Sequence, residues 1–136
     1  MNGKFRVWDE DTHEYHRGDF SITQDGKVWL FVDEDNPPME CPSDNYIVEY
    51  STGLKDKNGK EIYEGDIITG LGYEQRGLIV WRDGGFGFMY EAKTQLQKEL
   101  SRGEDWYDFV PFSRHGHLEE ILGRFEIIGN IHEGAK

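Results

Sequence analysis

Short runs in which hydrophobic and polar residues alternate dominate the chain, and turn residues separate them. In KFRVWD at 4–9, Phe5 and Val7 alternate with Lys4 and Arg6, and in DFSIT at 19–23 the apolar residues Phe20 and Ile22 alternate with polar ones. Such alternation is typical of strands buried on one face. The dipeptide Asp25-Gly26 separates the second run from KVWLFV at 27–32 and predicts a hairpin there. The pattern therefore indicates antiparallel β-structure in the first part of the chain.

The same pattern continues towards the end of the chain. Further strands are predicted at residues 45–50, 66–69, 77–81, 87–90 and 125–132. The NG dipeptide at 58–59 is the strongest two-residue hairpin signal, because both residue types tolerate positive φ, and it should turn the segment 55–62 back on itself. The DGG run at 83–85 should join two of the later strands, and Gly129 is a candidate bulge in the last one.

Two short helices are expected between the strands. Thr94 and Gln97 have the spacing of a capping box, and Gly103 can end a helix in the left-handed conformation, which predicts a helix over 95–102. A second helix is predicted over 117–122. Helix is therefore a minor component of the chain.

An exposed loop is predicted at residues 33–45. Six carboxylates and no Lys or Arg lie between Asp33 and Glu49, and three prolines interrupt regular structure there. With many short strands, few helices and 17 glycines, the chain is expected to be mainly β, in the form of small barrels or a sandwich.

The composition shows that the chain is strongly acidic. The 136 residues hold 15 Lys and Arg against 27 Asp and Glu, a net charge of −12, so the field of the protein repels phosphate polyanions and anionic lipid. Direct binding to nucleic acid or to a membrane is therefore not expected. Four Trp, seven Tyr and eight Phe supply enough large apolar side chains for a folded core, which argues against a disordered acidic chain.

The single cysteine, Cys41, excludes an internal disulfide bond, and a reducing cytosol is the simplest compartment. The first residues have no apolar stretch of signal-peptide length, and no segment approaches 18 consecutive apolar residues. A cytoplasmic location is therefore expected.

Two groups of histidines and carboxylates are candidate metal sites. The first group is Asp9, Glu10, Asp11, His13, Glu14 and His16, and the second is His115, His117, Glu119 and Glu120, with His132 as a more distant candidate. The first lacks the glycine and the final glutamate of a calcium loop, and neither has a diagnostic spacing. A solvated turn and a surface loop are the favoured interpretations, and no metal, cofactor or catalytic residue is expected.

Nucleophile and phosphate-binding motifs give no stronger indication of an enzyme. No serine lies in a Gly-x-Ser-x-Gly turn, and Cys41 follows Glu40 in an acidic segment that disfavours a reactive thiolate. The glycines at 84–87 lead from one strand into another and not into a helix, so they are interpreted as a hairpin.

Three segments of the sequence carry a family resemblance. They are KFRVWDEDTHEY at 4–15, TGLKDKNGKEIYEGDII at 52–68 and FEIIGNIHE at 125–133. Together they resemble the YopX family of phage and prophage proteins, and the central segment is the most specific. The stretch from Arg114 to Leu122 departs from the usual pattern of the family.

The resemblance implies a fold more definite than the pattern alone. It implies a small N-terminal β region, residues 1–50, followed by an SH3-like β-barrel, residues 51–136, and the two can pack as one unit. It implies no established activity and supplies no catalytic residue.

The central segment has a structural and a functional interpretation. In the structural one, the turn at 58–59, a link between the two β regions at Ile62 and Tyr63, and a bend at Gly65-Asp66 shape the fold. In the functional one, polar residues of the segment face a partner; these are Asp56, Lys57, Glu61, Tyr63, Glu64 and Asp66.

Three hypotheses of function follow. The first is a non-enzymatic adaptor that binds a host or phage protein, with exposed anchors among Trp8, Trp29, Trp81 and Trp106, and above all at Trp106-Tyr107. The second is an acidic DNA mimic that inhibits a nucleic-acid-binding protein. The third is a metal-dependent hydrolase. Self-association is also possible, if the strand at 77–81 is an exposed edge.

Overall fold

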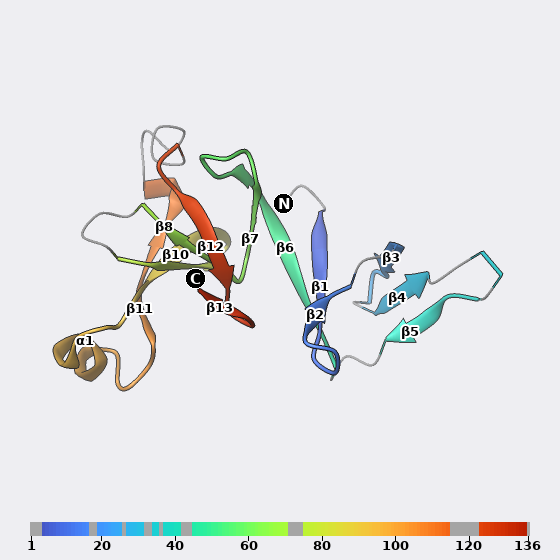
Figure 1. Ribbon diagram of the computed structural model, residues 1–136, viewed down its shortest axis with the longest axis horizontal. Helices are drawn as coiled ribbons and strands as arrows, with labels where there is room; N and C mark the ends of the chain where they lie inside the picture. The colour runs from blue at the N-terminus through green and yellow to red at the C-terminus, as the bar shows by residue number, and fades with distance from the viewer. Residues whose placement is uncertain are drawn as a thin grey trace. The chain divides into compact units, whose positions relative to one another are not determined.

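The computed structural model describes residues 4–16, 19–25, 27–31, 34–35, 37–41, 45–70, 75–114 and 123–135. Within these residues the protein is mainly β, with three antiparallel sheets, one of them curled into a half-barrel, and one short α-helix (Figure 1). The chain divides into two compact units. The N-terminal unit is Phe5–Glu49, and the C-terminal unit is Tyr50–Lys136 together with the residues up to Lys4.

The N-terminal unit is built on two sheets, as the alternating pattern predicts. In the first, the neighbours are β2 (Glu14–Tyr15), β1 (Phe5–Asp9) and the start of β6 (Tyr46–Lys55). The second has the order β3 (Asp19–Ile22), β4 (Val28–Phe31) and β5 (Met39–Cys41). Val7, Val28 and Leu30 form the buried centre of the core, and Phe20 and Ile22 pack against it. The predicted strands at 4–9, 19–23 and 27–32 and their hairpin are confirmed.

β5 corrects the prediction of a loop over 33–45. This strand pairs with β4 so that Val28 lies opposite Cys41 and Leu30 lies opposite Met39. Pro37 and Pro38 come just before the strand, so neither has to give an N–H group to the ladder. A strand of three residues is too short to show an alternating pattern, which is why the sequence did not reveal it.

The predicted turn at 58–59 lies between β6 and β7 (Glu61–Tyr63), but its form differs from the expected one. The Asp56 N–H donates to the Lys60 carbonyl over 2.8 Å, and the Gly59 N–H donates to the Asp56 carbonyl over 3.0 Å. The loop therefore has three residues, 57–59, and only Gly59 has a positive φ, of 80°. The two-residue turn is instead at Asp83-Gly84, where φ is 52° and 84°.

The C-terminal unit is a six-stranded sheet that curls into the half-barrel of Figure 1. Its order is β11 (Trp106–Pro111), β10 (Gly85–Glu91), β9 (Gly77–Arg82), β8 (Asp66–Thr69), β12 (Glu126–Asn130) and β13 (Gly134–Ala135). The core on one face of this sheet contains Ile68, Ile79 and Phe88, with Phe112 and Phe125 packed against them. The intervening residues Ile67, Leu78 and Met89 lie opposite one another across β8, β9 and β10 and belong to the other face.

The sheet order corrects one expectation about self-association. β9 lies between β8 and β10, so the strand at 77–81 is an interior strand: β10 pairs with it along its whole length, and β8 pairs with Gly77 and Leu78. β11 and β13 are the edges of this sheet, and a bulge with Asp108 at a φ of 52° interrupts β11. The bulge predicted in the last strand is confirmed, because the register of β12 shifts between Ile127 and Gly129.

The predicted first helix is confirmed as α1 (Gln95–Leu100). Thr94 is its N-cap, both hydrogen bonds of the capping box with Gln97 are present, and Gly103 follows with a φ of 82°. None of the helix residues is buried, and Leu96 and Leu100 are 64% and 73% exposed. A short 3₁₀-helix, η1, covers Phe112–Arg114. The second predicted helix, 117–122, lies outside the described residues.

Among the described residues, no helix has the length and apolar character needed to cross a membrane.

Candidate functional site

The carboxylate of Asp56 connects two segments of the C-terminal unit by hydrogen bonds. Its Oδ1 accepts hydrogen bonds from the N–H groups of Asn58 and Lys60, each over 2.9 Å, and its Oδ2 accepts one from the Ile127 N–H over 3.1 Å. Burial raises the pKa of Asp56, but the hydrogen bonds from Ile127, Lys60 and Asn58 together outweigh it and hold the pKa below the ordinary value. Asp56 is 6% exposed and fixes the β6–β7 turn to β12.

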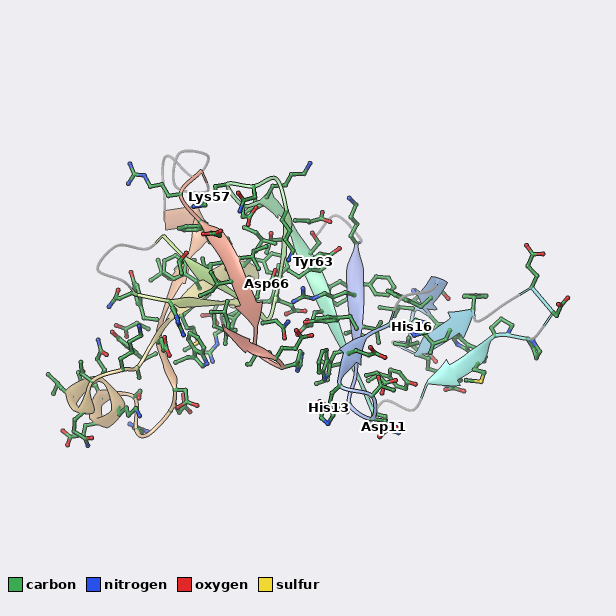
Figure 2. The ribbon with its side chains drawn as sticks, in the orientation of Figure 1. Asp11, His13, His16, Lys57, Tyr63 and Asp66 are labelled. Carbon is green, nitrogen blue, oxygen red and sulfur yellow. The ribbon has the colours of Figure 1, made fainter. Side chains whose placement is uncertain are left out.

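Asp66 has a similar internal role. It is 2% exposed, and its Oδ2 accepts a hydrogen bond from the Tyr63 N–H over 2.8 Å, which closes the bend at Gly65, where φ is 89°. The structure therefore removes Asp56 and Asp66 from the expected partner-facing patch, because buried carboxylates that bind backbone N–H groups cannot reach a partner. Figure 2 shows Lys57, Tyr63 and Asp66 within the C-terminal unit.

The other polar residues of the central segment are also engaged, though nearer the surface. The Glu64 carboxylate accepts the Tyr50 N–H over 2.9 Å, and the Lys57 Nζ lies 3.3 Å from Glu126 at an exposed position. Burial raises the pKa of Glu61, but a hydrogen bond from Ser51 and the positive charge of Lys4 hold it below the ordinary value. The Tyr63 hydroxyl donates to the Glu61 carboxylate over 3.3 Å. Ile62, which we expected to link the two β regions, lies fully buried in the core of the C-terminal unit.

The expected anchors Trp106 and Tyr107 lie on β11 and are both half-buried. The Tyr107 hydroxyl accepts a hydrogen bond from Gln97 Nε2 over 3.1 Å, and its ring centroid lies 6.0 Å from that of Tyr90. Tyr107 thus connects α1 to the sheet. Of the other candidate anchors, Trp8 is only 1% exposed and is wrong as a surface anchor, whereas Trp81 is 41% exposed.

Trp106 lines a groove of about 770 Å³ in the C-terminal unit. Its apolar lining includes Ile67, Leu78 and Met89, from the face of the sheet opposite the core. Both signs of charge surround it, with Arg76, Arg82 and Lys98 against Glu91, Glu104 and Asp105. The groove therefore favours neither a cationic nor an anionic partner.

The first candidate metal group falls on the β1–β2 turn. The Asp9 Oδ1 accepts the N–H of Asp11 over 2.8 Å, so this carboxylate closes the turn, and Figure 2 shows Asp11 and His13 there. Among the residues that the structure describes, no three His, Cys, Asp or Glu side chains come together to hold a metal. The second candidate group, with His115 and His117, lies outside the described residues, apart from His132.

The N-terminal unit holds most of the negative charge. Twelve Asp and Glu stand against Arg6, Arg17 and Lys27 between Phe5 and Glu49, a net charge of −9 in 45 residues, whereas the rest of the chain carries −3. The Arg6 Nε lies 2.8 Å from Glu49, and its guanidinium lies 4.3 Å from the centroid of the Tyr15 ring. Arg6 therefore compensates a buried carboxylate of its own unit.

Lys27 also forms ion pairs within this unit. Its Nζ lies 3.9 Å from Asp25 and 3.7 Å from Glu40. Four exposed carboxylates of this unit form no ion pair with any cation that the structure describes; these are Glu10, Asp11, Glu14 and Glu34. The field of the N-terminal unit is therefore largely uncompensated.

Trp29, one of the expected anchors, lies on an aromatic surface of the N-terminal unit together with Phe31, which was not among the expected anchors. Phe31 on β4 is 43% exposed, and Trp29, two residues earlier, is half-buried on the same face of the strand. The alternation in KVWLFV could have revealed this face, because Val28 and Leu30 are the core positions and Trp29 and Phe31 must point away from them.

Comparisons with known proteins agree with this architecture. The family model described as YopX protein matches residues 4–136. The crystal structure of protein EF1440 from Enterococcus faecalis is 23% identical, with a TM-score of 0.52 over 96% of this chain and 93% of that one. The crystal structure of protein yopX from Bacillus subtilis is 19% identical, with a TM-score of 0.55 over 98% of this chain and 96% of that one. None of the curated proteins compared with the chain matches it.

Proposed function

The chain belongs to the YopX family, and from this premise we propose that it is a phage- or prophage-encoded, non-enzymatic module that binds a protein partner with a basic surface. In this proposal the C-terminal half-barrel is an SH3-like scaffold, and the acidic N-terminal unit is the binding part. The proposed site of action is the cytoplasm of the bacterial host.

The uncompensated charge of the N-terminal unit is the observation that carries the proposal. A net charge of −9 on 45 residues attracts a positively charged surface and raises the rate of encounter with it. The same field repels nucleic acid and anionic lipid, which leaves a basic protein as the best-matched class of partner.

Affinity capture with matched charge variants tests the proposal. One variant replaces Glu10, Asp11, Glu14 and Glu34 of the N-terminal unit by the corresponding amides. The control replaces four exposed carboxylates of the C-terminal unit in the same way; these are Asp83, Glu99, Glu104 and Glu133. Both variants change the net charge by the same amount, so they differ only in where the charge is removed.

The immobilised full chain is incubated with host lysate at low and at high salt. We expect the first variant to lose a specific protein that the wild type and the control retain, and we expect high salt to weaken its capture. Equal capture by both variants would contradict the proposal, because the location of the charge would then be irrelevant.

A DNA mimic is the second candidate, and the same exposed carboxylates favour it. In that case the captured protein would itself bind nucleic acid, and duplex DNA added to the lysate would displace it. No contact among the described residues favours the third hypothesis, a metal-dependent hydrolase.

A further inference from the structure

The outward face of the β3–β4–β5 sheet carries a half-buried tryptophan, an exposed phenylalanine and an exposed glutamate. Trp29 lies opposite Ser21 on β3 and opposite Glu40 on β5, and Phe31 follows on the same side of β4. We call the surface formed by Ser21, Trp29, Phe31 and Glu40 the Trp29 face. It is opposite to the side of β4 whose residues Val28 and Leu30 form the core.

The side chains of the Trp29 face cover its aromatic rings only in part. Ser21 is small and exposed, so the neighbour of Trp29 on β3 covers little of the indole. Phe31 is 43% exposed, although removing a large apolar side chain from water is favourable. A large apolar side chain that a unit leaves in water beside a second aromatic residue is typical of a contact surface.

The charges around the face determine the chemistry of its partner. Glu40 lies opposite Trp29, its side chain is 47% exposed, and Lys27 is its cation at 3.7 Å. Such an exposed ion pair contributes little to stability, so a cation of a partner can replace Lys27 at little cost. A cation held above an indole ring is attracted by the ring itself, most strongly for tryptophan.

We propose that the Trp29 face is the docking surface for the basic partner, where Lys or Arg side chains pack on Trp29 and Phe31 and pair with Glu40. This inference rests on the proposed function and adds the location of the contact. The exposed carboxylates of the unit steer the partner towards it, and the aromatic rings supply the close contact.

Titration of the full chain with a fluorescein-labelled nona-arginine peptide, followed by fluorescence anisotropy, tests the location. Trp29→Ala should weaken binding by about fivefold, the loss expected for about 1 kcal/mol of cation–π attraction. Phe31→Ser changes a surface position without opening the core and should also weaken binding. Trp81→Ala is the matched control, because Trp81 is an exposed tryptophan of the C-terminal unit, and it should bind like the wild type.

A second measurement keeps the test independent of the stability of the variants. The chain is labelled with 5-fluorotryptophan, and its ¹⁹F signals are assigned with Trp29→Phe and Trp81→Phe. The peptide should shift the Trp29 signal and leave the Trp81 signal in place.

The outcomes separate the two proposals. If the wild type binds the peptide and Trp29→Ala and Phe31→Ser bind it equally well, the Trp29 face is refuted while the basic-partner proposal survives. If the wild type does not bind the peptide at low salt, both proposals fail. Binding of a labelled DNA duplex that depends on Trp29 would also overturn the inference, because the partner would then be a nucleic acid.

Discussion

Replacing Asp56 by Asn removes one connection between segments that are far apart in the sequence. The amide oxygen of Asn can still accept the N–H groups of Asn58 and Lys60 in the β6–β7 turn. The amide nitrogen, however, faces the Ile127 N–H, so two donors meet where Oδ2 now accepts a hydrogen bond over 3.1 Å. The variant thus keeps the turn and loses one of its links to β12, while the hydrogen bond from the Lys57 N–H to the Phe125 carbonyl and the Lys57–Glu126 ion pair remain.

The expected loss in the free energy of unfolding follows from the three hydrogen bonds of the Asp56 carboxylate. Leaving the half-buried Ile127 N–H without an acceptor costs about 1–3 kcal/mol. The two turn hydrogen bonds lose the charge of their acceptor, and each weakens by about 0.5 kcal/mol because water reaches these exposed positions. We therefore expect Asp56→Asn to lower the free energy of unfolding by about 2–4 kcal/mol, a large part of the stability of a small domain.

Urea unfolding of the full chain near pH 7 measures this loss, and amide hydrogen exchange of Ile127 shows whether it is local. Asp83→Asn is the control, because it makes the same chemical change at an exposed hairpin turn and should stay within about 0.5 kcal/mol of the wild type. A loss below about 0.5 kcal/mol for Asp56→Asn would refute the structural role of this carboxylate.

The pH dependence of the same variant gives an independent check. The folded-state pKa of Asp56 lies below the ordinary value of 3.8, so the ionised carboxylate stabilises the fold. This contribution is fully present above the unfolded-state pKa and is lost as the pH falls through the folded-state pKa. The difference between wild type and Asp56→Asn should therefore be constant from about pH 7 to 5 and shrink below about pH 4.

Three further predictions test other parts of the fold. Gly70→Ala should lower the free energy of unfolding by more than about 2 kcal/mol, because φ is 99° and the new Cβ would lie 2.2 Å from a backbone oxygen. Gly84→Ala is the control: it has open space around the new Cβ and should lower the same quantity, measured by urea unfolding, by about 1 kcal/mol. Thr94→Ala should speed amide exchange in α1 by about fivefold and leave global stability nearly unchanged, since the helix buries no side chain; a large global loss would contradict this. Glu49→Gln should lower the free energy of unfolding of the N-terminal unit by about 1–3 kcal/mol, because it weakens the ion pair with Arg6. NMR spectra recorded during a urea titration check this, since the signals of the N-terminal strands should be lost at a lower urea concentration than in the wild type.

The family signature illustrates how local information specifies only part of a structure. The position of its turn is readable from the Asn58-Gly59 dipeptide, because both residue types tolerate positive φ, and Gly59 adopts it in the structure. The role of Asp56 cannot be read from the sequence, because one of the N–H groups that its carboxylate binds, that of Ile127, is 71 residues away along the chain. The same residue therefore supported both a structural and a partner-facing interpretation until the strands were in place.

The sequence by itself determined the positions of most strands, the capped helix and the concentration of negative charge before residue 50, because alternation, capping and composition act over a few neighbouring residues. The tertiary structure decided that β8 lies between β9 and β12, that β5 completes the small sheet, and that Trp8 is buried while Phe31 is exposed. These features depend on which distant strands pair and which faces meet, and that choice minimises the free energy of the whole chain and not of any one segment.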